Sequence, residues 1–112
     1  MKPVRLNRSL VLEAPERVPD GAGGYVNGWV PLGTLWAEVV ARTGREKQGE
    51  AVPVSTVGYR ITVRGAPIGT TSRPQPDQRF REGARLFRIL AVTERDPDGR
   101  YLTCFAEEEV AA

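Results

Sequence analysis

The chain has 112 residues, which suits one small domain and is too short for two ordinary ones. Hydrophobic residues make up 40% and charged residues 27%, a balance typical of a globular chain rather than a disordered one. There is no histidine and only one cysteine, Cys104, so zinc sites built from Cys and His, catalytic pairs that need histidine, and an intrachain disulfide are all excluded. Any catalysis would have to use carboxylates, Lys, Tyr or an acquired metal. We therefore expect no enzyme, no metal site and no cofactor.

The sequence also lacks the segments that direct a chain into a membrane. No apolar run is long enough for a transmembrane helix, and the first five residues are not followed by the apolar core of a signal peptide. We expect synthesis in the cytoplasm and no membrane partner.

The charges are uneven along the chain, although the net charge is only +2. Fourteen of the 16 basic residues are Arg, which favours bidentate contacts to phosphate or carboxylate, but a GC-rich genome enriches Arg as well. Residues 60–100 hold nine Arg against five acids, and the run Glu107-Glu108-Glu109 is acidic. Such asymmetry is typical of head-to-tail contact between copies or of contact with nucleic acid.

The N-terminal third predicts a strand and a turn. Leu6, Leu10 and Leu12 recur with a period of two that lapses at Arg8, which indicates a half-buried strand over residues 6–13. Pro15 and the glycine-rich run at residues 19–24 are typical turn residues, so we expect a flexible hairpin connection there.

Residues 34–42 predict a second strand with Ala37 on its apolar face. Trp36 falls on the opposite, more polar face. A Trp in that position marks either a contact surface or a cover for a second small core. The next segment, residues 44–57, is polar and contains Gly49 and Pro53, so it is either a loop with one helical turn or a mobile excursion.

The second half predicts further strands separated by strong turn signals. Residues 58–64 alternate without fault, and the proline-rich residues 65–77 form a long irregular loop. A tight turn at residues 82–83 joins two strands, in the second of which Phe87, Ile89 and Ala91 share one face. The run at residues 96–99 is another turn, and Leu102, Cys104 and Ala106 form the buried face of the last strand.

These elements predict an all-β fold. We expect one domain over residues 1–112, a small β-barrel or sandwich of about six strands, with long loops and at most one short helix. No internal repeat is visible.

Familiar ligand motifs fail on inspection. Gly44 and Gly49 have the first spacing of a phosphate-binding P-loop, but Glu50 stands where Lys is needed. The glycines of residues 21–24 do not form a dinucleotide fingerprint. Asp96 and Asp98 resemble part of a calcium loop without its downstream acid, which favours a plain turn.

A single-stranded nucleic-acid-binding barrel remains the alternative function. Its groove would use basic residues from the second half of the chain with stacked aromatic rings. Phe80 and Phe87 are the rings available, although Phe87 shares a face with core residues. The basic candidates are Arg79, Arg81, Arg85 and Arg88.

The order of features from Leu6 to Glu108 resembles the head-tail joining proteins of long-tailed phages, also called head completion or stopper proteins, which have relatives in gene transfer agents. No single feature is specific, but their order and spacing together are. The matching pieces are the strand at residues 8–12, the Asp-Gly-x-Gly-Gly turn at 20–24, Trp29, the Leu-Trp-Ala-Glu-Val strand at 35–39, Gly-Arg-Glu at 44–46, Tyr-Arg-Ile-Thr-Val-Arg at 59–64, the hairpin at 83–92, and the closing strand that ends in Glu107-Glu108.

The resemblance implies a structural role at the head-tail interface of the virion. Copies would form a ring, a hexamer or dodecamer, with portal and adaptor proteins above and tail terminator or tail tube proteins below. The ring would close the channel on packaged double-stranded DNA without reading its sequence. In such proteins a long loop plugs the channel. Carried onto this chain, the channel-closing residues are Gly44, Arg45, Glu46, Lys47, Gln48, Gly49 and Glu50.

A ring of identical copies needs two different faces that fit each other. The uneven charges and the outward Trp could supply them, so we expect the contacts with neighbouring copies to involve Trp36, Arg60, Arg64, Arg73, Glu107 and Glu108.

Overall fold

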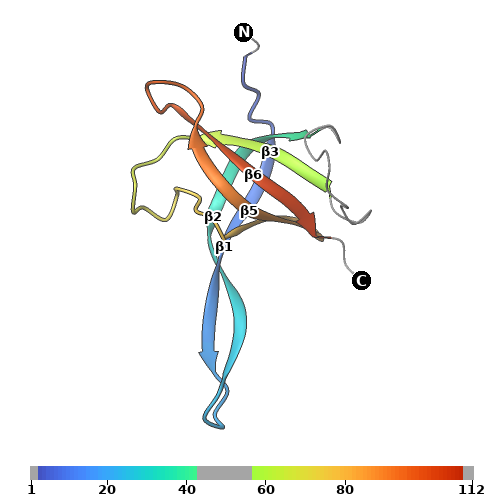
Figure 1. Ribbon diagram of the computed structural model, residues 1–112, viewed down its shortest axis with the longest axis vertical. Helices are drawn as coiled ribbons and strands as arrows, with labels where there is room; N and C mark the ends of the chain where they lie inside the picture. Colours follow the sequence, from blue (N-terminus) through green and yellow to red (C-terminus); the bar gives the residue numbers. More distant parts are fainter. Residues whose placement is uncertain (1–2, 43–56, 110–112) are drawn as a thin grey trace, which may run out of the picture.

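The structure is a computed structural model that describes residues 3–42 and 57–109, and it contains six antiparallel strands (Figure 1). The strands are β1 (Arg8–Pro19), β2 (Tyr25–Ala41), β3 (Val57–Arg64), β4 (Arg79–Glu82), β5 (Arg85–Glu94) and β6 (Tyr101–Glu109). They close into a barrel in the order β1-β2-β3-β6-β5-β4. The described residues form no helix. The predicted all-β fold is confirmed, and of the two predicted architectures the barrel is the one observed.

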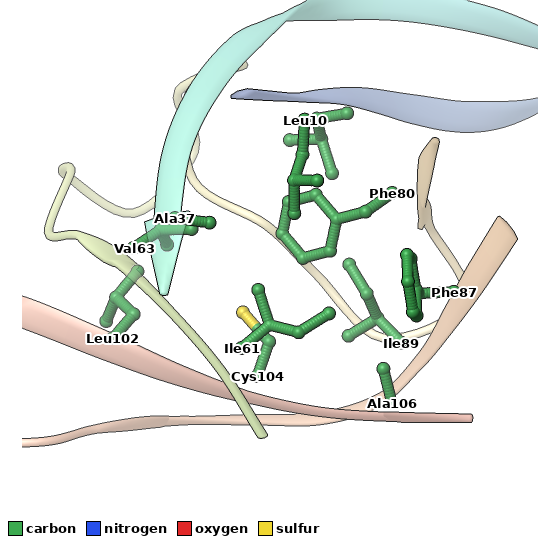
Figure 2. Close-up of a cluster of buried hydrophobic side chains, with 11 residues drawn as sticks. Leu10, Ala37, Ile61, Val63, Phe80, Phe87, Ile89, Leu102, Cys104 and Ala106 are labelled. Atoms are coloured by element: carbon green, nitrogen blue, oxygen red, sulfur yellow. The ribbon is translucent and has the colours of Figure 1, made fainter. Parts of the chain in front are cut away.

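Apolar side chains from all six strands fill the inside of the barrel and form its core (Figure 2). Because side chains alternate across a strand, every second residue points inward. Burial of each large side chain contributes about 1.5–3 kcal/mol. The fully buried hydrophobic residues of the strands are Leu10, Leu12, Ala37, Ile61, Val63, Phe80, Phe87, Ile89, Leu102, Cys104 and Ala106.

Two irregularities change which residues face inward. The pairing of β5 with β6 shifts between Ile89 and Ala91, so Ala91 is exposed and Val92 packs against the core instead. The prediction that Ala91 shares the buried face was therefore wrong, because a bulge inserts one residue and reverses the alternation. A second shift lies between Leu12 and Glu13 in the pairing of β1 with β2.

The first hairpin is much longer than the sequence suggests. In its outer part, residues 14–30, β1 and β2 pair only with each other and project beyond the barrel (Figure 1). We call this part of the hairpin the arm. Pro15 lies inside β1, so its assignment to a turn was wrong. The turn itself is at Asp20, whose carboxylate oxygen Oδ1 accepts hydrogen bonds from the amides of Ala22 (2.8 Å) and Gly24 (3.0 Å).

The predicted turn at residues 96–99 and the irregular loop at residues 65–77 are confirmed, whereas the tight turn predicted at residues 82–83 lies at residues 83–84, because Glu82 still belongs to β4. The Asp96 carboxylate accepts hydrogen bonds from the amides of Arg100 (3.2 Å) and Tyr101 (3.0 Å), so this acid closes its own turn. The proline-rich loop between β3 and β4 is irregular, and Arg73 fastens it by donating from Nη1 to the carbonyl of Ala66 (2.9 Å). The ambiguous segment between β2 and β3 lies outside the described residues, apart from Val57.

Candidate interaction surfaces

One end of the barrel is closed by a network of ion pairs. Here β1, β3 and β5 begin and β4 and β6 end, so inward-facing residues at their termini meet. Arg8 pairs with Glu82 (Nε–Oε2 2.9 Å), and Arg85 pairs with Glu108 (Nε–Oε2 2.8 Å). Arg85 also donates to the hydroxyl of Tyr59 (3.2 Å). The lapse at Arg8 in the predicted strand thus places a charged residue at the mouth of the core.

These contacts hold both carboxylates in the ionised form. The hydrogen bond from Arg8 lowers the pKa of Glu82, and the hydrogen bond from Arg85 lowers the pKa of Glu108. Burial raises the pKa of Tyr59. At neutral pH the network therefore consists of paired charges and a neutral phenol, an arrangement that caps the core and offers no group poised for proton transfer.

A second cluster lies where the arm leaves the barrel. Glu13 is 6% exposed and accepts hydrogen bonds from Arg79 (Nε–Oε1 2.7 Å) and Arg81 (Nε–Oε2 2.9 Å). The Arg79 guanidinium also stacks on the ring of Trp29, with its carbon 4.1 Å from the centroid. Burial works against ionisation of Glu13, but the hydrogen bonds from Arg81 and Arg79 together outweigh it and lower its pKa. This cluster joins β1, β2 and β4.

The outer surface of the barrel carries a shallow groove of about 1040 Å³ across β2, β3, β6 and β5. Its charges are largely compensated within the chain. Arg95 donates to Thr62 Oγ1 (3.3 Å) and lies 3.8 Å from a carboxylate oxygen of Glu38, which also accepts from the amide of Arg5 (3.1 Å). Arg60 lines the same groove and is exposed. The groove is mixed in character and is not a basic cleft.

A smaller hollow of about 500 Å³ lies beside Trp36 and is called the Trp36 groove below. Trp36 is 60% exposed, so within the described part of the chain it covers no second core. Arg64 lies on the neighbouring strand at the edge of the same hollow. The lining residues are Leu6, Thr34, Leu35, Trp36 and Arg64.

The structure separates the residues predicted to contact neighbouring copies. Trp36 and Arg64 share one groove, and Arg60 lines the other. Arg73 is half-buried and holds its own loop, whereas Glu108 is paired with Arg85 at the barrel end. Glu107 is half-buried near the end of the same strand. The predicted channel-closing residues 44–50 lie outside the described residues.

The sequence reasoning missed the Glu13 cluster and the arm. The hydrogen-bond partners of Glu13 are Arg79 and Arg81, which follow it by 66 and 68 positions in the sequence. Local sequence patterns give no signal of a contact over such a separation. The arm did have a signal in Tyr25, Val26 and Val30, which are strand-forming residues directly after the turn.

No site for chemistry emerges from the described residues. Burial raises the pKa of the Cys104 thiol to about 12, so this side chain is a packed core residue. Among residues 3–42 and 57–109, no three His, Cys, Asp or Glu side chains are grouped so that they could hold a metal ion. The same residues contain no helix long and apolar enough to cross a membrane.

Comparison with known proteins decides the family. The model of the phage head completion protein family matches residues 1–109. The chain belongs to this family. This head completion protein is also similar to a chain in the virion of a native gene transfer agent particle, at 58% identity and a TM-score of 0.79, over 99% of this chain and 100% of the other. The family resemblance drawn from the order of motifs is confirmed.

A second similar structure is the solution structure of protein SF1141 from Shigella flexneri 2a. It covers all of both chains with a TM-score of 0.71 at 21% identity, which shows a shared fold. No curated protein matches the chain. Membership of the family makes the protein a structural component of the virion head.

Proposed function

We propose that this head completion protein forms a ring, a hexamer or dodecamer, between the portal and adaptor proteins on one side and the tail terminator or tail tube proteins on the other. The ring closes the channel on packaged double-stranded DNA and offers the surface on which the tail docks. The observation that carries the proposal is the family match over nearly the whole chain, joined to a 58% identical chain that is part of an assembled virion.

The surfaces of the barrel support a structural role over catalysis. The acids near the core are paired with arginines, the thiol is buried, and in the larger groove Arg95 is paired with Glu38. A protein that only binds its neighbours needs such a rigid scaffold with several distinct outer faces. The role is therefore non-enzymatic.

The alternative function, binding of single-stranded nucleic acid, has little support from the side chains it would need. Phe80 and Phe87 are fully buried and cannot stack on bases. Arg79, Arg81 and Arg85 are engaged by carboxylates of the same chain. These three arginines thus form ion pairs within the barrel and are not free to bind phosphate groups.

Closure of the channel is assigned to residues 44–50 on the strength of the family resemblance. We expect that deletion of residues 47–54 leaves the barrel folded, because every described core residue lies outside that segment. Particles carrying the deletion should assemble and then lose DNA. Normal DNA retention in those particles would remove the assignment of this segment while leaving the connector role intact.

The connector role itself is tested in the host that makes the particles. A strain without the gene should yield DNA-filled heads that leak and free tails, and expression of the chain should restore joined particles. Electron microscopy of purified particles should then place the chain at the head-tail junction and give the copy number. Normal joined particles from the deleted strain, or absence of the chain from purified particles, would refute the proposed function.

A further inference from the structure

The arm has two faces of different chemistry. Residues directly opposite each other in an antiparallel pair put their side chains on the same face, and the faces alternate along each strand. The register pairs Ala14 with Val30, Glu16 with Gly28, and Val18 with Val26, so these six residues share one face. We call it the valine face. The other face carries Trp29 and Tyr25, and an arginine of the same chain stacks on each ring, although Tyr25 is still 58% exposed.

The valine face carries the exposed aliphatic side chains of the arm. Val18, Val26 and Val30 are 39%, 54% and 37% exposed, and Gly28 leaves the space opposite Glu16 open. A two-stranded ribbon without a third strand or a packing partner is only marginally stable in water. The arm projects from the barrel (Figure 1), and no other described strand pairs with it. Its valines therefore lack the partner that comparable residues find in the core.

One charge lies in the middle of this apolar face. Within the described part of the chain, the Glu16 carboxylate has no hydrogen bond and no ion pair. The Trp36 groove has the complementary composition, because Arg64 borders the apolar surface of Leu6, Leu35 and Trp36. Its guanidinium likewise has no side-chain partner among the described residues. The two surfaces thus match in kind: an apolar strip with one acid, and an apolar hollow with one base.

The arm cannot reach the groove of its own chain. Val26 and Trp36 both lie on β2, ten residues apart, which is about 30 Å along a strand. The ribbon would have to fold back on itself through the strands that build the barrel. Two copies can satisfy the match, and because it joins two different surfaces the contact is head-to-tail, the type of contact from which rings are built.

We infer that the valine face of one copy docks in the Trp36 groove of the next copy, with Glu16 paired to Arg64 across the contact. The inference rests on the proposed function for the existence of a ring, and it names the residues that hold neighbouring copies together. It also gives Trp36 and Arg64, which were predicted as contact residues, a defined partner surface.

The first test is a charge exchange in particles. Glu16→Arg and Arg64→Glu should each lower the amount of chain in purified particles about tenfold or more, because each places like charges together, and the double variant should recover to within about threefold of the wild type. Arg17→Glu is the matched control, since it reverses a charge on the adjacent residue of the other face. Circular dichroism should show that all variants fold, as these side chains are on the surface.

The second test is a cross-link that does not depend on assembly yield. A chain with Glu16→Cys and Arg64→Cys, treated in particles with a short bismaleimide, should give a ladder of multimers, and either single variant should give none. The native Cys104 is buried and should not react with the cross-linker. If the wild-type chain is present in particles but no ladder forms, or if the charge reversals assemble as well as the wild type, the inference is overturned and the connector role stands. If the wild-type chain is absent from particles, the connector role fails and the inference fails with it.

Discussion

The Glu13 cluster gives the sharpest test of what holds the barrel together. Glu13→Gln keeps the shape of the side chain but removes its charge, and the amide nitrogen must face one arginine donor. One charge-assisted hydrogen bond is lost, worth about 1.5–3 kcal/mol, and breaking a buried ion pair from one side costs about 3–5 kcal/mol. Arg81 is 41% exposed and can return to water, whereas Arg79 is 16% exposed and cannot do so fully. We therefore expect a loss of about 3 kcal/mol.

Urea unfolding followed by circular dichroism measures this loss of free energy directly. In thermal unfolding the Tm should fall by roughly 12 °C. The matched control is Glu16→Gln, which removes the same charge from the same strand at an exposed position. The control should change the free energy of unfolding by less than about 0.5 kcal/mol. If Glu13→Gln costs less than about 1 kcal/mol, or no more than the control, the cluster does not stabilise the barrel and our reasoning on it is wrong.

Three further results are expected from the isolated protein. The pKa values of Glu82 and Glu108 are lowered in the folded state, so their contribution to the stability of the fold is complete above the unfolded pKa of 4.5 and is lost as the pH falls through the folded pKa values. The urea midpoint should therefore decline as the pH falls from about 5 to 3. A constant or rising midpoint would contradict this. Gly65→Ala should destabilise the protein by about 1–3 kcal/mol in thermal unfolding, because the new Cβ would lie 2.1 Å from the carbonyl oxygen of Gly99, whereas Gly28→Ala, with nothing within 4 Å, should be close to neutral. Iodoacetamide at pH 8 should leave Cys104 unmodified in the native protein and alkylate it in urea, since burial raises its pKa to about 12; rapid native alkylation would show that the barrel opens readily.

Local patterns predicted the parts of the fold that local physics decides. The alternation of Tyr59, Ile61 and Val63 indicated both a strand and its inward face. The structure has strand β3 at these residues, with Ile61 and Val63 buried in the core. The Asp96 turn was predicted because Pro and Gly suit a four-residue turn, and the carboxylate of Asp96 closes it as expected.

The parts that depend on distant residues were not predicted. Nothing near Glu13 indicates that Arg79 will bury it, and nothing near Ala91 indicates the bulge that turns it outward. The arm was read as a turn because of Pro15 and the glycines, although only residues 20–24 reverse the chain. For the candidate site, the outward Trp36 was recognised, whereas its neighbour Leu6 was assigned to the buried face of a strand that in fact begins at Arg8.

The prolines within the long hairpin have a consequence for the protein before assembly. Strands at an open edge can recruit strands from other chains and aggregate, and the closed barrel has no such edge while the arm has two. Pro15 and Pro19 carry no amide hydrogen, so on the β1 edge of the arm they interrupt the row of donors that an incoming strand would need, and Pro31 does the same on β2 directly beyond the arm. The arm can therefore make contacts through its side chains while resisting indiscriminate strand exchange, which suits a protein that becomes part of a virion.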